Sequence, residues 1–389
     1  MRVSHVLALA AALVVVQTGP AFGAAPPSPP AGADATQGGS GVVDAARAKV
    51  AAGDTKGAIE GLAPYVAAHP TDATAGRLLG DLYFRVPDYA KAEKIWKALV
   101  AATPEDRETH SRLGSLYAVE DRVGEALGEF QLSLPNHTGY VGLVMMHKRN
   151  GDLGQYLQQL QSDTDLHPFD VARWAELGEA ERALRHFDLA YAAFNHVVGI
   201  RPSSCSARVD IANALVDLGR IDQAITHLRA CLAIDANHYP AVVNLGEAYL
   251  EKYEYDTAKP YLERALTLRP EGPEALVDMG YLYDAHGDWK TAITYYNRAI
   301  RSDPMKPEAY IDLGFDYNQH RLFPLAEAAY LNGISVASED GRLHYMLAVT
   351  YNLQGKIALA RDQYQHALTS EEPLVVRLAK AELALLPSQ

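Results

Sequence analysis

Two short apolar stripes recur along the chain, and residues 273–306 show them most clearly. In PEALVDMGYLYDAHGDWKTAITYYNRAIRSDPMK, apolar residues return every three or four positions on both sides of Gly287-Asp288, and Pro304 follows the second run. This spacing predicts a helix, a tight turn, a second helix and a stop. Small residues such as Gly280 and Ala292 predict that the two backbones come close. Because one such hairpin cannot bury both stripes alone, the segment predicts a stack of similar hairpins.

The same register repeats on both sides of this segment. With Pro273 as position 1, most copies carry glycine or alanine at position 8, alanine at position 20 and a large aromatic residue at position 24. Position 8 holds Gly80, Gly114, Gly178, Ala212, Gly246, Gly314 and Ala348, and position 20 holds Ala58, Ala92, Ala126, Ala190, Ala224, Ala258, Ala326 and Ala360. Position 24 holds Trp96, Phe130, Phe194, Tyr296, Tyr330 and Tyr364. Ten copies counted in this register begin near residues 39, 73, 107, 137, 171, 205, 239, 273, 307 and 341.

This pattern resembles the tetratricopeptide repeat, in which W-x2-L-G-x2-Y is followed by A-x3-F and then by proline over 34 residues. The run from Trp174 to Gly178, followed by Ala190, Phe194 and Pro202, is a close single copy. The resemblance covers about residues 39 to 374. It implies an all-α fold, a right-handed α-solenoid of about ten helix-turn-helix repeats.

Composition and repeat register divide the chain into five segments. We predict a signal peptide at 1–23, a disordered Pro- and Gly-rich linker at 24–41, an N-terminal lobe of three repeats at 42–136, a C-terminal lobe of seven repeats at 137–374 whose first is degenerate, and a capping helix at 375–389. The third copy is short, because Pro135 falls where its second helix should continue. We therefore expect an irregular joint over residues 133–156, either a hinge or drift from the repeat pattern. Pro260 predicts a kink or a delayed start in the second helix of the seventh copy.

The first 23 residues have the features of an export signal. Arg2 precedes an unbroken apolar run from Val6 to Val16, and Ala21-Phe22-Gly23 offers small residues for cleavage. The run is too short to span a bilayer, so we predict a cleaved secretory signal and no membrane insertion after cleavage. No cysteine follows the run, so lipid attachment is not predicted. The expected location is the bacterial periplasm.

Charge and motifs narrow the function classes. A formal net charge of −13 and a pI near 5.5 argue against a nucleic-acid partner. The sequence has no Gly-rich phosphate loop, no GxSxG elbow and no HExxH or CxxC motif. Its histidines are scattered over many repeat positions. We therefore predict no enzymatic activity, no cofactor and no metal site.

The two cysteines fall in one predicted hairpin. Cys205 opens the first helix of the sixth copy, and Cys231 lies late in its second helix. In an antiparallel hairpin the start of one helix lies beside the end of the other, so the two side chains could meet. A disulfide and a pair of buried thiols both fit this placement. Export to an oxidising compartment favours the disulfide.

The residues most particular to this chain lie opposite the packed stripe of the first helices. In tetratricopeptide arrays this side is implied to line an inner groove. Carboxylates, and in one copy the amide Asn244, recur there at position 6 in consecutive copies, which a merely solvated face does not require. The predicted peptide-binding residues are Glu176, Asp210, Asn213, Asn244, Glu247, Asp278, Tyr281, Asp284, Asp312, Phe315 and Asn318. In the first lobe the same side carries Arg77, Arg85, Arg112, Lys148 and Arg149, so we expect a cationic end and an acidic end.

These features favour a non-enzymatic interaction scaffold or adaptor in the bacterial cell envelope. Carboxylates stacked along one line repel one another, and an extended or basic segment of a protein partner would relieve that repulsion. One alternative is an accessory component of exopolysaccharide synthesis or export. Another is a factor for outer-membrane protein assembly or secretion.

Overall fold

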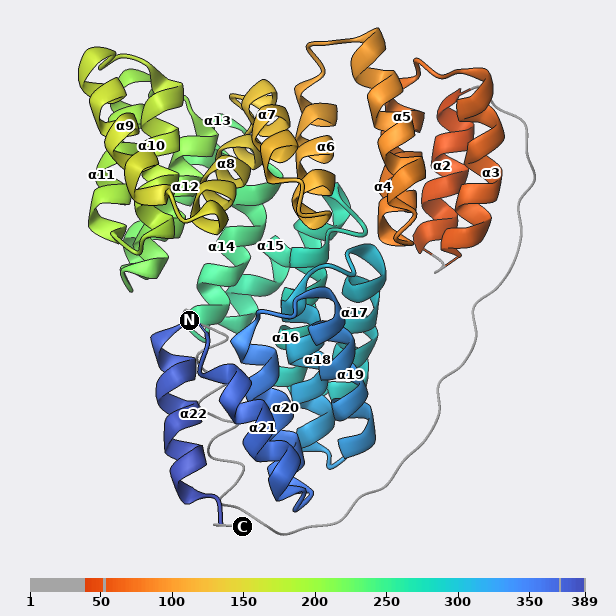
Figure 1. Ribbon diagram of the computed structural model, residues 1–389, viewed down its shortest axis with the longest axis vertical. Helices are drawn as coiled ribbons and strands as arrows, with labels where there is room; N and C mark the ends of the chain where they lie inside the picture. The colour runs from red at the N-terminus through yellow and green to blue at the C-terminus, as the bar shows by residue number, and fades with distance from the viewer. Residues whose placement is uncertain (1–38, 52–53, 371, 388–389) are drawn as a thin grey trace. The chain divides into compact units, whose positions relative to one another are not determined.

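The computed structural model describes residues 39–51, 54–370 and 372–387, and over these residues it consists of helices and short turns without strands (Figure 1). Twenty-one helices form ten consecutive pairs, α2/α3 to α20/α21, followed by the single helix α22. The all-α repeat fold expected from the sequence is confirmed. In the described part of the chain, no helix is long and apolar enough to cross a membrane.

The helix bounds follow the predicted register. The first helices of the pairs are α2 (Gly39–Ala51), α4 (Ala73–Arg85), α6 (Arg107–Val119), α8 (His137–Asn150), α10 (Val171–Ala183), α12 (Cys205–Asp217), α14 (Tyr239–Glu251), α16 (Pro273–Ala285), α18 (Pro307–Gln319) and α20 (Gly341–Leu353). The second helices are α3 (Thr55–Ala68), α5 (Tyr89–Ala102), α7 (Val123–Ser133), α9 (Leu153–Leu166), α11 (Phe187–Ile200), α13 (Ile221–Ile234), α15 (Tyr255–Leu268), α17 (Trp289–Ser302), α19 (Phe323–Val336) and α21 (Ile357–Ala367). All ten predicted copies begin where a first helix begins.

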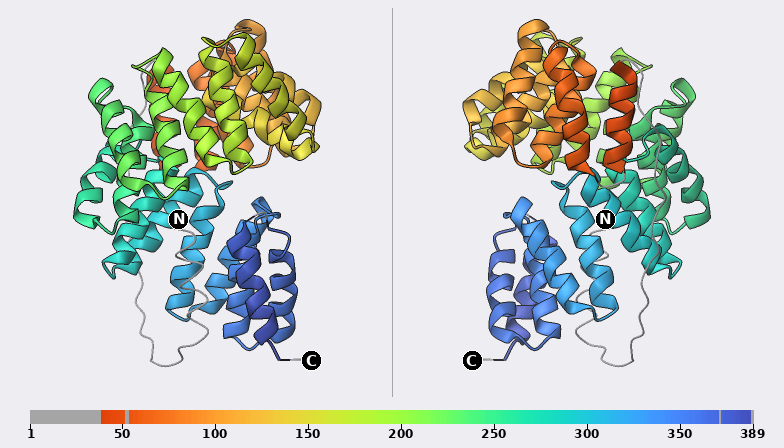
Figure 2. Two further views of the ribbon diagram at one scale, coloured as in Figure 1. Left: turned by 90° about the vertical axis from the view of Figure 1, so that its left-hand side faces the viewer. Right: turned by 90° about the vertical axis from the view of Figure 1, so that its right-hand side faces the viewer.

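The predicted signal peptide and most of the predicted linker lie outside the described residues. Because α2 begins at Gly39, the segment 39–41 is helical and does not belong to the linker. At the other end, the predicted capping helix is α22 (Pro373–Leu385), which packs against α20 and α21 (Figure 2). Val375 and Ala379 are fully buried in that contact layer, so α22 covers the apolar edge of the last pair.

Local chemistry favours the turn between α16 and α17. Before α17, the carboxylate of Asp288 accepts a hydrogen bond from the backbone N–H of Thr291, which caps the helix start. The preceding Gly287 has φ of +81°, a left-handed conformation that glycine adopts without steric cost. The equivalent residue is also left-handed in copies that lack glycine, such as Asp121 and Arg321. The turn geometry is therefore kept by the hairpin even where the sequence does not favour it.

A glycine and an aromatic ring lock the two helices of a pair together. A Cβ atom placed on Gly280 would lie 2.4 Å from Cε1 of Tyr296, and one on Gly314 would lie 2.4 Å from Cε1 of Tyr330. The alanines at position 20, such as Ala292, are fully buried. The sequence suggested that backbones meet at these small residues. At position 8 the structure places the aromatic ring of position 24 over the glycine instead.

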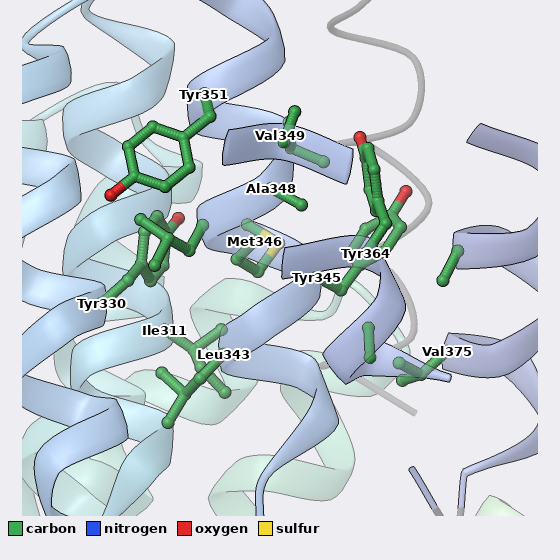
Figure 3. Close-up of a cluster of buried hydrophobic side chains, with 14 of the residues drawn as sticks. Ile311, Tyr330, Leu343, Tyr345, Met346, Ala348, Val349, Tyr351, Tyr364 and Val375 are labelled. Atoms are coloured by element: carbon green, nitrogen blue, oxygen red, sulfur yellow. The ribbon is translucent and has the colours of Figure 1, made fainter. Parts of the chain in front are cut away.

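The described residues form two compact units, divided within α14. The N-terminal unit ends at Ala248 and the C-terminal unit begins at Tyr249. In the C-terminal unit, side chains of α18, α19, α20, α21 and α22 form one buried apolar cluster (Figure 3). Tyr330, Tyr345 and Tyr364 are its largest fully buried side chains. Tyr330 and Tyr364 occupy position 24, where the sequence predicts core residues, whereas Tyr345 occupies position 5, which the sequence did not single out.

The predicted joint lies inside the N-terminal unit. There α7 ends at Ser133, the Leu134–Pro135 peptide bond is cis, and α8 begins at His137. The shortened third copy is thus present, while the boundary between a three-copy and a seven-copy lobe stays a prediction. In the C-terminal unit, α15 begins at its regular place and continues through Pro260, so the expected delay does not occur.

A disulfide joins Cys205 to Cys231, whose Cα atoms lie 4.8 Å apart. We expect neither cysteine to be alkylated when the native protein is isolated without reductant, and both to react after reduction. Replacing both by serine should lower the free energy of unfolding by about 3 kcal/mol, because the crosslink restricts the unfolded chain. Mass measurement of the alkylated protein and denaturant unfolding check the two statements. Two reactive thiols in unreduced native protein would contradict them.

Candidate functional site

The first helices of neighbouring repeats meet along rows of side chains that recur one repeat apart. In the N-terminal unit, the side-chain amide of Asn244 in α14 donates a hydrogen bond to Oδ1 of Asn213 in α12 at 2.7 Å. One repeat earlier, carboxylate oxygens of Glu179 in α10 and Asp210 in α12 lie within 4.8 Å of each other. Both pairs join position 9 of one copy to position 6 of the next. These two rows of the predicted groove are therefore also contacts between neighbouring repeats.

A second row crosses the C-terminal unit from position 12 of one copy to position 10 of the next. Nδ2 of Asn318 in α18 donates to Oγ1 of Thr350 in α20 at 2.8 Å. In the preceding pair of copies, the carboxyl groups of Asp284 in α16 and Asp316 in α18 are hydrogen-bonded to each other. Asn318 thus has a structural hydrogen bond in the place where the sequence suggested a ligand contact.

Burial separates the predicted peptide-binding residues into three groups. The buried ones are Glu176, Asp210, Asp278, Asp312, Phe315 and Asn318, the half-buried ones are Asn213, Asn244, Tyr281 and Asp284, and the exposed one is Glu247. The helical periodicity of single hairpins predicted an open acidic stripe, and the structure does not show one. Such a prediction omits the first helix of the neighbouring repeat, which covers part of the same face. The binding role of these residues stays a prediction.

Glu176 is held inside the N-terminal unit by an aromatic hydroxyl. The hydroxyl group of Tyr156 in α9 donates a hydrogen bond to Oε1 of Glu176 in α10. The ring of Tyr156 stacks on that of His147 at 3.8 Å between centroids. Burial raises the pKa of Glu176, and the hydrogen bond from Tyr156 opposes that rise. Tyr156 belongs to the degenerate fourth copy, where it takes the place of the usual alanine, and its hydroxyl satisfies a buried carboxylate.

Asp284 and Asp316 form the most strongly perturbed carboxyl pair. Asp316 is 1% exposed, and its Oδ2 atom has no hydrogen-bond partner among the described residues. Burial raises the pKa of Asp316 far above its ordinary value of 3.8, and the charges of Asp284 and Asp312 raise it further. Burial also raises the pKa of Asp284, which the hydrogen bond from Asp316 partly offsets. The pair therefore holds a proton at neutral pH, and Asp284 is the half-buried member through which solvent can reach it.

The expected cationic end is largely neutralised. Nη1 of Arg77 lies 2.8 Å from Oδ2 of Asp106, and Nε of Arg112 lies 2.7 Å from Oδ1 of Asp81. Nη2 of Arg149 lies 3.0 Å from Oδ1 of Asp121. The expectation of a cationic surface was wrong for these three arginines, because it counted the basic residues of this face and omitted their acidic partners. Asp81 lies on the neighbouring first helix α4, and Asp106 and Asp121 lie in the turns on either side of α6.

A pocket of about 490 Å³ lies in the same region of the N-terminal unit. Side chains from α4, α5 and α6 and from the start of α8 line it, among them Phe84, Trp96, Arg112, Ser115 and Thr138. The lining also includes the carboxylates of Asp81 and Glu108, both of which pair with Arg112.

Sequence reasoning did not select Asp316, although a signal for it exists. Position 10 is apolar in most copies, as in Leu82, Leu116 and Leu282, because it faces the neighbouring repeat. Asp316 is the charged exception at that position. A charge at a buried repeat position is the feature that could have identified it.

Comparisons with known proteins agree with this architecture. A family model described as tetratricopeptide repeat matches residues 43–106, 79–140, 209–273, 243–307 and 277–315, together more than half of the chain. This model describes a repeat and not a catalytic domain. No curated protein matches the sequence.

Three solved structures illustrate the similarity. The APC/C hetero-tetramer Cut9–Hcn1 is 17% identical over 88% of this chain and 83% of that chain, with a TM-score of 0.52. A monomeric mutant of IFIT1 with m7Gppp-AAAA is 15% identical over 80% of this chain and 81% of that one, with a TM-score of 0.53. A tetratricopeptide repeat protein from Parabacteroides merdae is 15% identical over 62% of this chain and 97% of that one, with a TM-score of 0.50. At these identities the similarity is one of fold.

Proposed function

Since the chain belongs to the tetratricopeptide repeat family, and a scaffold of this kind implies protein–protein interaction, we propose that it is a non-enzymatic adaptor whose first helices bind an extended, basic segment of a partner. The first helices of the C-terminal unit carry four of the predicted peptide-binding residues, the buried Asp278 and Asp312 and the half-buried Tyr281 and Asp284. The first helices form the concave surface that a repeat scaffold offers to a chain lying across it, and on this surface the half-buried Tyr281 and Asp284 are the accessible members of the four.

The observation that carries this proposal is the Asp284–Asp316 pair. The pair holds a proton because two adjacent ionised carboxylates would repel each other, and Oδ2 of Asp316 is buried without a hydrogen-bond partner among the described residues. A lysine or arginine of a partner that reaches the half-buried Asp284 would let the pair lose its proton and would gain a charge-assisted hydrogen bond. Tyr281 lies one helical turn before Asp284 on α16, so its aromatic ring is on the same face of the helix as the Asp284 carboxyl group.

The proposed place of action is the bacterial periplasm. The apolar run and small residues of the predicted signal support export, and the Cys205–Cys231 disulfide fits an oxidising compartment. Within the envelope, an accessory role in exopolysaccharide synthesis or export and a role in outer-membrane protein assembly remain the two alternatives. The identity of the captured partner distinguishes them.

Replacing Asp278 and Asp284 together by asparagine should lower partner capture from an envelope extract by about tenfold or more, because both carry charge on the proposed face of α16. Asparagine is the appropriate replacement, since Asp278 is 4% exposed and a lysine there would disturb the core. The matched control is Asp256→Asn with Glu263→Gln, which removes the same charge from exposed positions of α15.

Capture is measured by quantitative mass spectrometry of proteins retained on the purified protein and its variants. The protein retained by the wild type and by the control should be lost with the double variant, and its retention should fall as salt rises. Equal retention by all three proteins, with the double variant folded, would remove the acidic face from the proposal.

A further inference from the structure

Three metal-ligating side chains from three consecutive repeats converge in the N-terminal unit. They are His137 at the start of α8, Glu179 in α10 and Asp210 in α12. One ligand atom from each lies within 4.8 Å of the ligand atoms of the other two. Nδ1 of His137 is 3.6 Å from Oδ1 of Asp210. Two ligands bound to the same zinc ion lie about 3.4 Å apart in tetrahedral geometry, so small side-chain rotations would bring all three onto one ion.

Asp210 is the observation that points to a ligand. It is 7% exposed, and its carboxylate makes no hydrogen bond within the described part of the chain. Burial raises the pKa of this carboxyl well above its ordinary value, and the nearby charge of Glu179 adds to the rise. Buried carboxylates are ordinarily paired, hydrogen-bonded or bound to a metal. The charge of Arg182 offsets the rise in the pKa of Asp210 only in part, because its guanidinium group is paired with Glu179. The carboxylate of Asp210 faces His137 and Glu179, with Nδ1 of His137 at 3.6 Å from Oδ1.

Glu179 has an oxygen atom to contribute. It is 4% exposed, and the guanidinium group of Arg182 contacts its Oε2 atom at 3.1 Å. With Oε2 held in this way, Oε1 can bind an ion while Arg182 fixes the orientation of the carboxylate, as outer ligands do at metal sites. His137 is more exposed, with 52% of its side chain accessible, so the site has an open side through which an ion can enter.

We propose that His137, Glu179 and Asp210 bind one divalent transition-metal ion, of which Zn²⁺ is the best match. An imidazole and two carboxylates are the nitrogen and oxygen donors that Zn²⁺ accepts, and three protein ligands leave a fourth position for water or a partner side chain. The bound ion joins α8, which follows the shortened third copy, to α10 and α12. It thereby fixes the irregular fourth copy against its two successors.

The test is zinc binding by the untagged, disulfide-intact protein after removal of metal with EDTA. Calorimetric titration with Zn²⁺ should give one equivalent per chain and a rise in melting temperature. Asp210→Asn should weaken zinc affinity by more than about 100-fold, since loss of even an outer ligand costs about 10–100-fold. His137→Ala should also abolish the tight binding of one Zn²⁺ ion per chain. His167→Ala is the matched control, because His167 is an exposed histidine of the same unit outside the cluster.

Two readouts keep the result unambiguous. Without metal, the melting temperature of Asp210→Asn should be no lower than that of the wild type, because the substitution removes a buried carboxylate that lacks a hydrogen bond. An unchanged or higher melting temperature would show that the variant is folded. Cys205 and Cys231 also lie within 4.8 Å of a histidine, His238, so absence of free thiols must be verified to exclude zinc binding there. No bound equivalent, or an equivalent unchanged by both Asp210→Asn and His137→Ala, would overturn the proposal.

Discussion

Tyr330→Ala should lower the free energy of unfolding of the C-terminal unit by about 3–5 kcal/mol, the usual cost of truncating a large buried aromatic side chain. Tyr330 is fully buried in the apolar cluster of the last repeats, where its ring lies close to Ile311 and Leu343 (Figure 3). The ring also covers Gly314, where even a Cβ atom would lie 2.4 Å from it. Truncation therefore opens a cavity between the two helices of a pair as well as between pairs.

The measurement must resolve parts of the chain, because a repeat protein is stabilised by local interactions and need not unfold in one step. Hydrogen exchange followed in α18, α19 and α20 reports the loss, together with denaturant unfolding. Tyr253→Ala is the control, since Tyr253 is 56% exposed and its truncation should cost less than about 1 kcal/mol. Tyr330→Phe should cost little, because the hydroxyl is 3.4 Å from Nδ2 of Asn318, a weak contact. Equal effects of Tyr330→Ala and Tyr253→Ala would contradict the packing described.

Asp316→Asn should stabilise the C-terminal unit at neutral pH, which is the second large effect. The folded state raises the pKa of Asp316 above its ordinary value of 3.8, through burial and the neighbouring charge of Asp284. Between the two pKa values the folded state binds a proton that the unfolded state has lost. The protonated pair therefore contributes fully to the free energy of unfolding at pH values below the pKa that Asp316 has in the unfolded chain. This contribution is lost as the pH rises toward the pKa of Asp316 in the folded protein. The slope of this loss is up to about 1.4 kcal/mol per pH unit for one proton.

Denaturant unfolding from pH 5 to pH 8 (the range over which the pair should keep its proton) checks this prediction. The wild type should lose stability across this range relative to Asp316→Asn, whose amide can donate to Asp284 at every pH. Asp256→Asn, at an exposed position of α15, should follow the wild type. If the wild type and Asp316→Asn show parallel stability profiles, the pair does not hold the proton assigned to it.

The hairpins could be predicted because their determinants lie within one repeat. Ala292, Tyr296 and Gly280 interact inside the α16/α17 pair, and their spacing along the chain is the spacing of helix turns. Asp288 caps α17 through a residue only three positions away. Interactions of such short range leave a regular pattern in the sequence, and repetition of that pattern gave the start of every pair.

The candidate site could be predicted only in part, because its state depends on contacts between repeats. The sequence placed Asp210, Asp278 and Asp312 on one side of their helices, but the structure buries all three. It did not identify Asp316 as the partner of Asp284, nor His137 as a neighbour of Asp210. The two members of each pair lie one or two repeats apart. The helical periodicity of a single hairpin therefore cannot show which residue contacts which.

By itself, the sequence determined the ten helical pairs, their register, the capping helix and the aromatic residues of the core, since helical periodicity and small residues at fixed positions act locally. Only the tertiary structure decided which carboxylates are buried, which arginines are neutralised and which side chains from separate repeats converge. Those outcomes depend on how one first helix packs against the next. Burial then sets the pKa of each carboxyl, and with it the kind of cation that each can bind.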